Sequence, residues 1–217
     1  MNATTMHPPL PLLPATPVPP GTQDVMIDLE TLSTRADAAI TSIGAVWFNP
    51  STQEVGTPLH LVVDMANSIA TGGHVCGDTL RWWLQQSDAA RQAICQPGVP
   101  LAEALQTLAC YLSQVAPLDA VRVHANGADF DLPILASACH RLSLPVPWRY
   151  YNQRCMRTLC RMYPQVEAPI TLGTEHNAAD DALHQALHAL QIMQVHQSVQ
   201  LVRTAPALPL PDEQPHA

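Results

Sequence analysis

The chain has few basic side chains. Its 217 residues include ten lysines and arginines against eighteen aspartates and glutamates, and the formal net charge at pH 7 is −8. Proteins that hold nucleic acid over a broad area need a positively charged surface, so this composition argues against a broad electrostatic grip on nucleic acid. It is compatible with a small acidic site that binds metal ions first and phosphate second.

Long apolar runs and paired cysteines are also missing. No apolar run approaches the roughly 18 residues that a membrane span needs, and the start of the sequence lacks the basic and apolar regions of a signal peptide. The six cysteines form no CxxC motif and no zinc-type spacing with histidine. We therefore expect a cytoplasmic protein with reduced thiols and no membrane partner. A homodimer is compatible with the sequence.

Proline is abundant at both ends of the sequence. Seven prolines fall within residues 1–22 and four within 203–217. Because proline removes a backbone donor and fixes φ, neither segment can form a helix or a central strand. We expect two disordered tails around one folded domain at 23–202, and a partner-binding polyproline stretch is the alternative for a tail.

Apolar periodicity predicts the elements of the domain. Three strands joined by short links should form an antiparallel meander between residues 25 and 64. Further strands are expected at 120–125 and 149–152, and helices at 78–84, 87–94, 101–115, 130–142, 155–162 and 177–199. This order is typical of an α/β fold, with a mixed sheet of about five strands flanked by helices.

The most informative stretch is a strand that ends in two carboxylates. The apolar run 25–27 leads into Asp28 and Glu30, which share one face because side chains alternate along a strand, while Leu29 points to the core. Such a pair is costly unless a cation lies between the two groups or they share a proton. One interpretation is half of a divalent-metal site, and the other is a solvated strand end that continues into a loop.

Three further polar residues lie where strands end or helices begin. Asp131 follows the strand at 120–125, and a parallel arrangement would place it beside the first two carboxylates. Asp181 projects from the first turns of the last helix, whose alanines allow a close approach to the sheet, and His176 precedes that helix. Taken singly, Asp131 could be a carboxylate at a helix N-terminus, and His176 a capping or surface residue.

Taken together, three segments resemble the motifs of the DEDDh 3′–5′ exonucleases, a family with an RNase H-like fold. In order, they are Asp28-x-Glu30-Thr31, Asn126-x-x-x-Phe130-Asp131 and His176-x-x-x-x-Asp181. The chain is also similar to the phage and prophage branch, often labelled exodeoxyribonuclease VIII-like, and to the mycobacterial 3′–5′ exoribonuclease domain. That finer likeness rests on Ile43-Gly44-Ala45-Val46, on the run from Trp82 to Ser87, on the run from Asn126 to Asp131, and on the run from Arg154 to Thr158.

The resemblance implies a metal-dependent exonuclease that acts on single-stranded DNA or RNA 3′ ends and releases nucleoside 5′-monophosphates. Two Mg²⁺ or Mn²⁺ ions would serve the two ends of an in-line displacement, and such hard ions prefer carboxylate oxygens. Asp28 would bridge both ions, with Glu30 and Asp181 on the ion that carries the water. Asp131 would complete the second ion, and His176 would be the general base.

The resemblance also suggests residues that contact the substrate. Thr31 would offer a backbone donor to the terminal nucleotide and Leu32 an apolar wedge, with loop filling as the alternative for Leu32. Asn126 is a further candidate. Arg154 and Arg157 are expected on one helix face, where they would contact phosphate or else form salt bridges.

Other questions stay open in the sequence. Trp82 and Trp83 are both expected in the core, and the alternative is that one of them stacks on a base.

A non-catalytic module that binds nucleic acid or a replication partner would keep the fold but lose a motif residue, and none is missing. A phosphodiesterase for small nucleotides would need a short, closed cleft. DNA and RNA are both open as substrates, because recognition of the 2′-OH depends on contacts that the sequence does not place.

Overall fold

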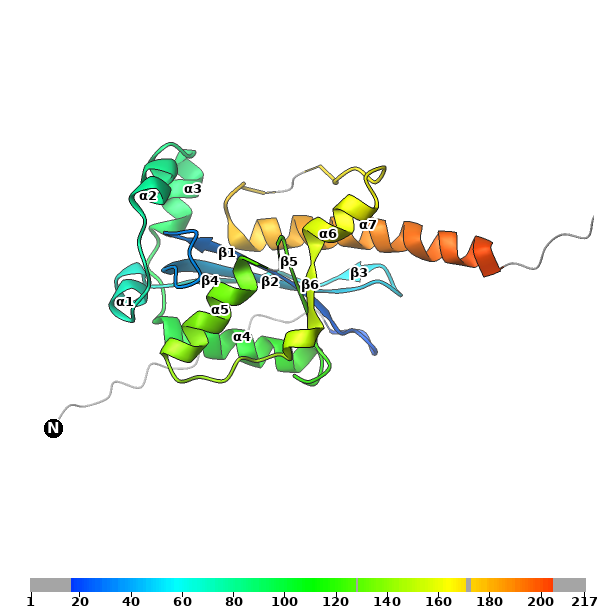
Figure 1. Ribbon diagram of the computed structural model, residues 1–217, viewed down its shortest axis with the longest axis horizontal. Coiled ribbons are helices and arrows are strands. Elements are labelled where there is room, and N and C mark those ends of the chain that lie inside the picture. The colour runs from blue at the N-terminus through cyan, green and yellow to red at the C-terminus, as the bar shows by residue number, and fades with distance from the viewer. Residues whose placement is uncertain (1–16, 128, 171–172, 205–217) are drawn as a thin grey trace, which may run out of the picture.

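The computed structural model describes residues 17–127, 129–170 and 173–204, and at its centre is a six-stranded mixed sheet (Figure 1). The strands are β1 (Asp24–Thr31), β2 (Ile40–Asn49), β3 (Glu54–Val55), β4 (Leu59–Val62), β5 (Arg122–Ala125) and β6 (Gln153–Cys155). They are ordered β3-β2-β1-β5-β6, and β4 also pairs with β2. β1 is antiparallel to β2 and parallel to β5, so the carboxyl ends of β1 and β5 share one edge.

Helices cover both faces of this sheet. They are α1 (Met65–Ala70), α2 (Gly77–Leu84), α3 (Asp88–Ile94), α4 (Leu101–Val115), α5 (Asp131–Arg141), the 3-10 helix η1 (Tyr150–Asn152), α6 (Met156–Met162) and α7 (Ala178–Thr204). In Figure 1, α4 and α5 lie below the sheet, α6 and α7 lie above it, and α2 and α3 lie beyond the end of β1. Within the described residues, none of the helices has both the length and the apolar character of a membrane span.

The alternation of side chains along β1 divides the interior into two cores. Ile27 and Leu29 pack into one core with residues of α4 and α5, and Met26 packs into the other with α6 and α7. Asp28 and Glu30 continue the row of Met26 and therefore face α7. The predicted mixed sheet flanked by helices is confirmed, and so are the shared face of the two carboxylates and the inward direction of Leu29.

Several element boundaries differ from the prediction. Helix α1 was not predicted, because its six residues are too few to show a helical period; Asp64 caps it by accepting a 2.9 Å hydrogen bond from the backbone of Asn67. The two-residue strand β3 was missed for the same reason of length. Helix α2 begins at Gly77, one residue before the predicted start, with Cys76 as its N-cap. The strand expected at 149–152 is the helix η1, and strand pairing begins only at Gln153.

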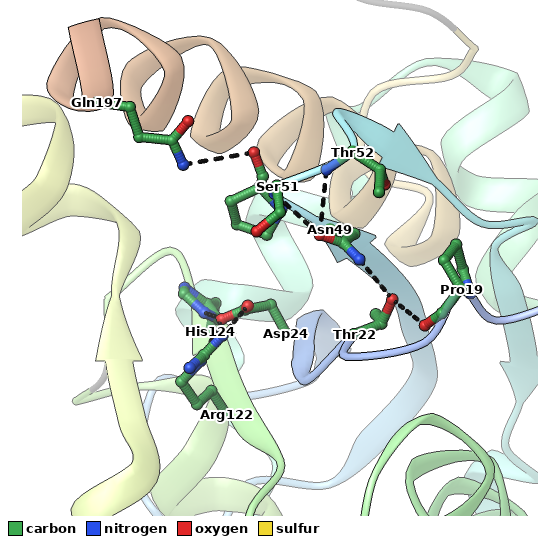
Figure 2. A network of polar contacts seen from close by, with 10 residues as sticks. Pro19, Thr22, Asp24, Asn49, Ser51, Thr52, Arg122, His124 and Gln197 are labelled. Atoms are coloured by element: carbon green, nitrogen blue, oxygen red, sulfur yellow. Dashed lines mark hydrogen bonds and ion pairs between the residues drawn. The ribbon is translucent and has the colours of Figure 1, made fainter. Parts of the chain in front are cut away.

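Asp24, at the amino end of β1, is a buried carboxylate whose negative charge is balanced by neighbouring side chains (Figure 2). Asp24 is 2% exposed and accepts hydrogen bonds from Nε and Nη2 of Arg122, and Nε2 of His124 lies 2.8 Å from its Oδ1. Burial alone would raise the pKa of Asp24, but the bonds to Arg122 and His124 outweigh it and lower the pKa. These contacts also tie β1 to β5.

The packed region begins before residue 23. Val18 contacts the first core, and the buried Thr22 hydroxyl donates a 2.7 Å bond to the carbonyl oxygen of Pro19 and accepts a 2.9 Å bond from Asn49 (Figure 2). Residues 17–22 are thus attached to the sheet. The rest of the predicted proline-rich tails, residues 1–16 and 205–217, lies outside the described residues.

Candidate active site

A cavity of about 460 Å³ opens where β1 and β5 end. Its walls combine residues from β1, the turn after β5, α5, α6 and the first turns of α7. The lining residues are Asp28, Leu29, Glu30, Asn126, Phe130, Asp131, Arg157, Glu175, His176, Asp181, His184 and Gln185. The structure therefore brings the four predicted carboxylates and His176 into one cavity.

The amino end of α7 is packed tightly against β2, next to Asp28. Gly44 pairs with Asp28 in the β1–β2 ladder, and a Cβ at Gly44 would lie 1.9 Å from the carbonyl oxygen of Ala178. Only glycine permits this approach. Ala178 and Ala182 are completely buried, so small residues on α7 complete the contact. This packing carries Asp181 from α7 toward the carboxylates of β1.

Asp131 connects the amino end of α5 to β1. Its side chain is 3% exposed, and its Oδ1 accepts a 3.2 Å hydrogen bond from the backbone N–H of Leu29. The sequence predicted this proximity from a parallel arrangement of β1 and β5, and the two strands are parallel.

The carboxylates in the cavity lack the compensation that Asp24 has. Burial raises the pKa of Glu30 to about 8, and the charges of Asp181 and Asp131 add to the effect. Burial also raises the pKa of Asp131 to about 7. For Asp28, burial and then the charges of Asp131 and Glu30 raise the pKa well above its usual range, and burial raises the pKa of Asp181 as well. None of the ion pairs among the described residues includes these four groups.

This donor set fits divalent metal ions. Hard cations such as Mg²⁺ and Mn²⁺ prefer carboxylate oxygens, and a bound cation would remove the mutual repulsion that raises these pKa values. Ligand atoms of Glu30, His176 and Asp181 lie within 4.8 Å of one another, a separation that one ion could span. Bound metal ions would then neutralise the negative charge of these carboxylates, as Arg122 does for Asp24.

His176 is held in position by its backbone and by its ring. Its N–H donates a 3.0 Å hydrogen bond to Oδ2 of Asp181, and its φ of 64° lies in the left-handed region that few residues other than glycine adopt. The imidazole ring lies edge-on to the indole of Trp82, with 4.8 Å between ring centroids. Both contacts restrict the position of His176, which lines the first cavity.

The two adjacent tryptophans have different environments. Trp83 is 3% exposed, and its indole N–H donates a 2.9 Å hydrogen bond to the carbonyl oxygen of Thr31. Trp82 is 41% exposed, so the expectation that both belong to the core is wrong for Trp82. It lines a second cavity of about 510 Å³, which shares Leu29, Glu30 and Phe130 with the first.

The predicted substrate contacts are distributed unevenly around these cavities. Thr31 lines the second cavity, and its hydroxyl donates a 2.7 Å bond to the carbonyl oxygen of Ser33. Leu32 is 2% exposed, packs in a small cluster with Trp83 and lines neither cavity. Asn126 lines the first cavity.

The two arginines do not share a helix face. Arg157 lies on α6, lines the first cavity and donates a 3.1 Å bond to the carbonyl oxygen of Asn126. Arg154 lies on β6 and lines neither cavity; its guanidinium donates 2.9 Å bonds to the carbonyl oxygens of Tyr151 and Gln153. The predicted pairing on one face is wrong because α6 begins only at Met156.

Three polar residues that line the cavity were not predicted from the sequence: Glu175, His184 and Gln185. Gln185 is the most informative, because its amide Nε2 donates a 2.8 Å hydrogen bond to Oδ1 of Asp28. Its position four residues after Asp181 places both side chains on one face of α7, and this spacing was the available signal. Among the described side chains, Oε1 of Gln185 and Nδ1 of His184 are buried without a partner.

Comparison with known proteins identifies the family of this chain. The sequence model of the 3′–5′ exoribonuclease Rv2179c-like domain matches residues 23–193. The chain belongs to this family. It is a 3′–5′ exonuclease, and the likeness to the mycobacterial exoribonuclease domain that the sequence suggested is confirmed. Assignment to the phage branch stays a prediction. No curated protein matches the sequence.

Solved structures share the fold at low sequence identity. The nuclease domain of 3′hExo, a DEDDh family member bound to rAMP, is 14% identical with a TM-score of 0.55, and the match covers 81% of this chain and 94% of that chain. Exonuclease I from Methylocaldum szegediense is 14% identical with a TM-score of 0.57, over 83% of this chain and 45% of the other. Escherichia coli Exonuclease I in complex with a dT13 oligonucleotide is 14% identical, with a TM-score of 0.52 over 83% and 42%. The chain thus spans less than half of either Exonuclease I, and it has the RNase H-like fold of this group.

Proposed function

We propose that this exonuclease removes nucleotides from single-stranded 3′ ends with the help of two divalent ions, Mg²⁺ or Mn²⁺, and releases nucleoside 5′-monophosphates. The observation that carries the proposal is the convergence of four carboxylates with raised pKa values in one cavity of a 3′–5′ exonuclease. The raised pKa values mean that burial and mutual repulsion favour the neutral form of these carboxyl groups, whereas bound cations would keep them ionised and usable as ligands.

Each carboxylate has a place in this scheme. Asp28 has two carboxylate neighbours, Glu30 further along β1 and Asp131 at the start of α5. It would bridge the two ions. Glu30 and Asp181 would hold the ion that carries the water, and Asp131 would complete the shell of the other ion. The bound ions would supply an acidified water and neutralise charge on the leaving oxygen.

His176 would take the proton from the attacking water. Its ring lies within reach of Glu30 and Asp181, so a water held by these two carboxylates would be next to it. Trp82 and the bond to Asp181 restrict where the ring can go, which keeps the base near the position where a water would lie.

The surroundings of the cavity favour a nucleotide as the group that enters. The exposed ring of Trp82 and the side chain of Phe130 border the second cavity and offer apolar surface for the terminal base. Arg157 supplies a positive charge beside Asp131 for a phosphate. Thr31 and Asn126 complete the proposed contacts. The family description favours RNA as substrate, and the bound rAMP and dT13 of the structural neighbours support single-stranded ligands.

The proposal is tested with end-labelled single-stranded RNA and DNA incubated with the full chain and Mg²⁺ or Mn²⁺. We expect a ladder of products shortened from the 3′ end, nucleoside 5′-monophosphates as the released species, and no reaction with chelator or with Asp28→Ala. Binding of either polymer without hydrolysis would instead identify a non-catalytic module. Hydrolysis of dinucleotides alone would identify a small-nucleotide phosphodiesterase.

A further inference from the structure

One stretch of this acidic chain has arginines and no acidic side chain. Residues 132–166 contain five arginines and no aspartate or glutamate, although the net charge of the chain is −8. Arg141 lies apart at the end of α5. The other four are exposed and follow one another along η1, β6 and α6: Arg149, Arg154, Arg157 and Arg161. None of the four takes part in an ion pair with any carboxylate that the structure describes.

Two exposed aromatic rings stand at the start of this stretch. Tyr150 is 82% exposed and Tyr151 59% exposed, and their rings pack edge to face with centroids 5.3 Å apart. Arg154 donates to the carbonyl oxygen of Tyr151, and Asn152 donates a 2.9 Å bond to the carbonyl oxygen of Asp119. The backbone beneath the rings is therefore anchored to the domain, and the two tyrosines form a platform with much of its ring surface exposed.

This platform is aligned with the active site. β6 is the edge strand of the sheet and runs parallel to β5. The segment therefore leads from η1 toward the edge where the cavity opens, and Arg157 lines that cavity. In Figure 1 this segment is the yellow stretch that runs along β6 into α6. The five residue-to-residue steps from Asn152 to Arg157 span at most about 18 Å.

We propose that η1, β6 and α6 form a track for the upstream part of a single-stranded nucleic acid whose 3′ nucleotide occupies the active site. Bases would stack on Tyr150 and Tyr151, and phosphates would pass Arg149, Arg154 and Arg157. This inference rests on the proposed function. Exposed aromatic rings beside cationic side chains are the combination that single-strand binding uses, because every base has a stacking face and every linkage a charge.

The charge of the remaining surface strengthens the assignment. The whole chain is net negative, whereas this stretch carries five positive charges without a compensating acid. A polyanion would be repelled by most of the molecule and attracted to this edge. The expected substrate class is therefore a polynucleotide that extends beyond the active site, and the track makes longer substrates better than dinucleotides.

The test compares substrates of two lengths in wild type and in the double variant Tyr150→Ala/Tyr151→Ala. One substrate is a single strand of about 12 nucleotides, within the ~4–16-nucleotide site sizes of single-strand binders, and the other is the dinucleotide with the same 3′ end. Loss of base stacking should raise the KM for the long substrate by about 5-fold or more. The kcat of both substrates and the KM for the dinucleotide should be unchanged.

A second variant tests the charge. Arg149→Gln should raise the KM for the long substrate and reduce its dependence on salt, because one phosphate contact is lost. Gln106→Glu on the exposed side of α4 changes the net charge by the same amount and should leave both unchanged. Thermal melting of each variant checks that the fold is kept.

Different outcomes separate the track from the activity itself. If wild type cleaves neither substrate, the proposed function fails. If wild type cleaves both with the same kcat/KM, or if the double variant raises both KM values equally, the activity stands and the track is wrong. A variant Gln106→Glu that matches Arg149→Gln in every measurement would also overturn the track.

Discussion

The amide of Gln185 on α7 donates a 2.8 Å hydrogen bond to Oδ1 of Asp28 on β1. The bond fixes the orientation of the carboxylate that would bridge two ions. It spans the contact between α7 and the sheet, where Gly44 and Ala178 allow a close approach. Among described groups, Oε1 of Gln185 is buried and unpartnered, so the amide can also accept a hydrogen bond from water inside the cavity. Gln185 therefore acts on the site as a positioning residue.

Replacing this amide should weaken metal binding. Partners that orient metal ligands typically contribute about 10- to 100-fold to affinity or activity, so Gln185→Ala should reduce Mn²⁺ affinity and turnover by a factor in that range. Isothermal titration with Mn²⁺ measures the first and single-strand hydrolysis the second. Gln191→Ala, an exposed position on the same helix, is the matched control. Equal behaviour of the two variants would remove Gln185 from the account.

Removal of His176 should separate proton transfer from metal binding. His176→Ala should lower kcat by about 10²- to 10⁴-fold, the usual contribution of a general base, while Mn²⁺ binding survives because the carboxylates remain. Asp181→Ala should lose metal affinity as well as rate. Turnover of His176→Ala close to that of wild type on every polynucleotide would show that the histidine is not the base.

The metal-free protein should become less stable as the pH rises. The pKa of Glu30 in the folded protein is about 8, above the ~4.3 of an unfolded chain. Between these values the unfolded chain ionises this group while the folded chain keeps its proton, so the free energy of unfolding falls from about pH 4 to about pH 8. Asp131, with a raised pKa of about 7, acts in the same direction.

Urea unfolding in the presence of chelator, at several pH values across this window, measures the effect. Glu30→Gln should flatten the dependence, whereas Glu54→Gln, at an exposed position on β3, should leave it as in wild type. Adding Mn²⁺ should reverse the trend, because a bound cation favours the ionised carboxylates. A free energy of unfolding that rises with pH in the chelated wild type would contradict the assigned pKa shifts.

Gly44 should be essential to the position of α7. A methyl group in Gly44→Ala would meet the backbone of Ala178, so the helix must shift and carry Asp181 with it. Overpacking of this kind costs about 1–3 kcal/mol, and we expect that loss of stability together with loss of activity. Gly77→Ala is the control, since a Cβ there has no heavy atom within 4 Å. Denaturant unfolding and hydrolysis assays on the two variants provide the comparison.

The site was predictable from sequence wherever a single element determines it. The alternation of β1 placed Asp28 and Glu30 on one face, and the helical turn that begins α7 placed Asp181. The position of Asp131 needed one further inference, the parallel pairing of β1 with β5, which the structure has. The alanines of α7 predicted its close approach to the sheet, and the structure has this contact at Gly44 of β2.

Residues whose role depends on tertiary contacts could not be predicted in this way. Gln185 looks like any polar residue on a partly exposed helix until α7 is docked on β1. Trp82 and Trp83 have the same sequence signal, and only the packing of α2 decides which of them is buried. Arg154 was misplaced because β6 has only three residues, too few for an alternating pattern, and α6 follows it directly.

The central claim is that the four carboxylates of the cavity hold two metal ions, and counting bound ions tests it most directly. Metal-free full chain is titrated with Mn²⁺, and both the number of bound ions and the melting temperature are recorded. We expect two ions per chain, a melting temperature that rises with Mn²⁺ concentration by mass action, and loss of both effects in Asp28→Ala. Wild type that binds no Mn²⁺, or Asp28→Ala that binds as many ions as wild type, would contradict the account.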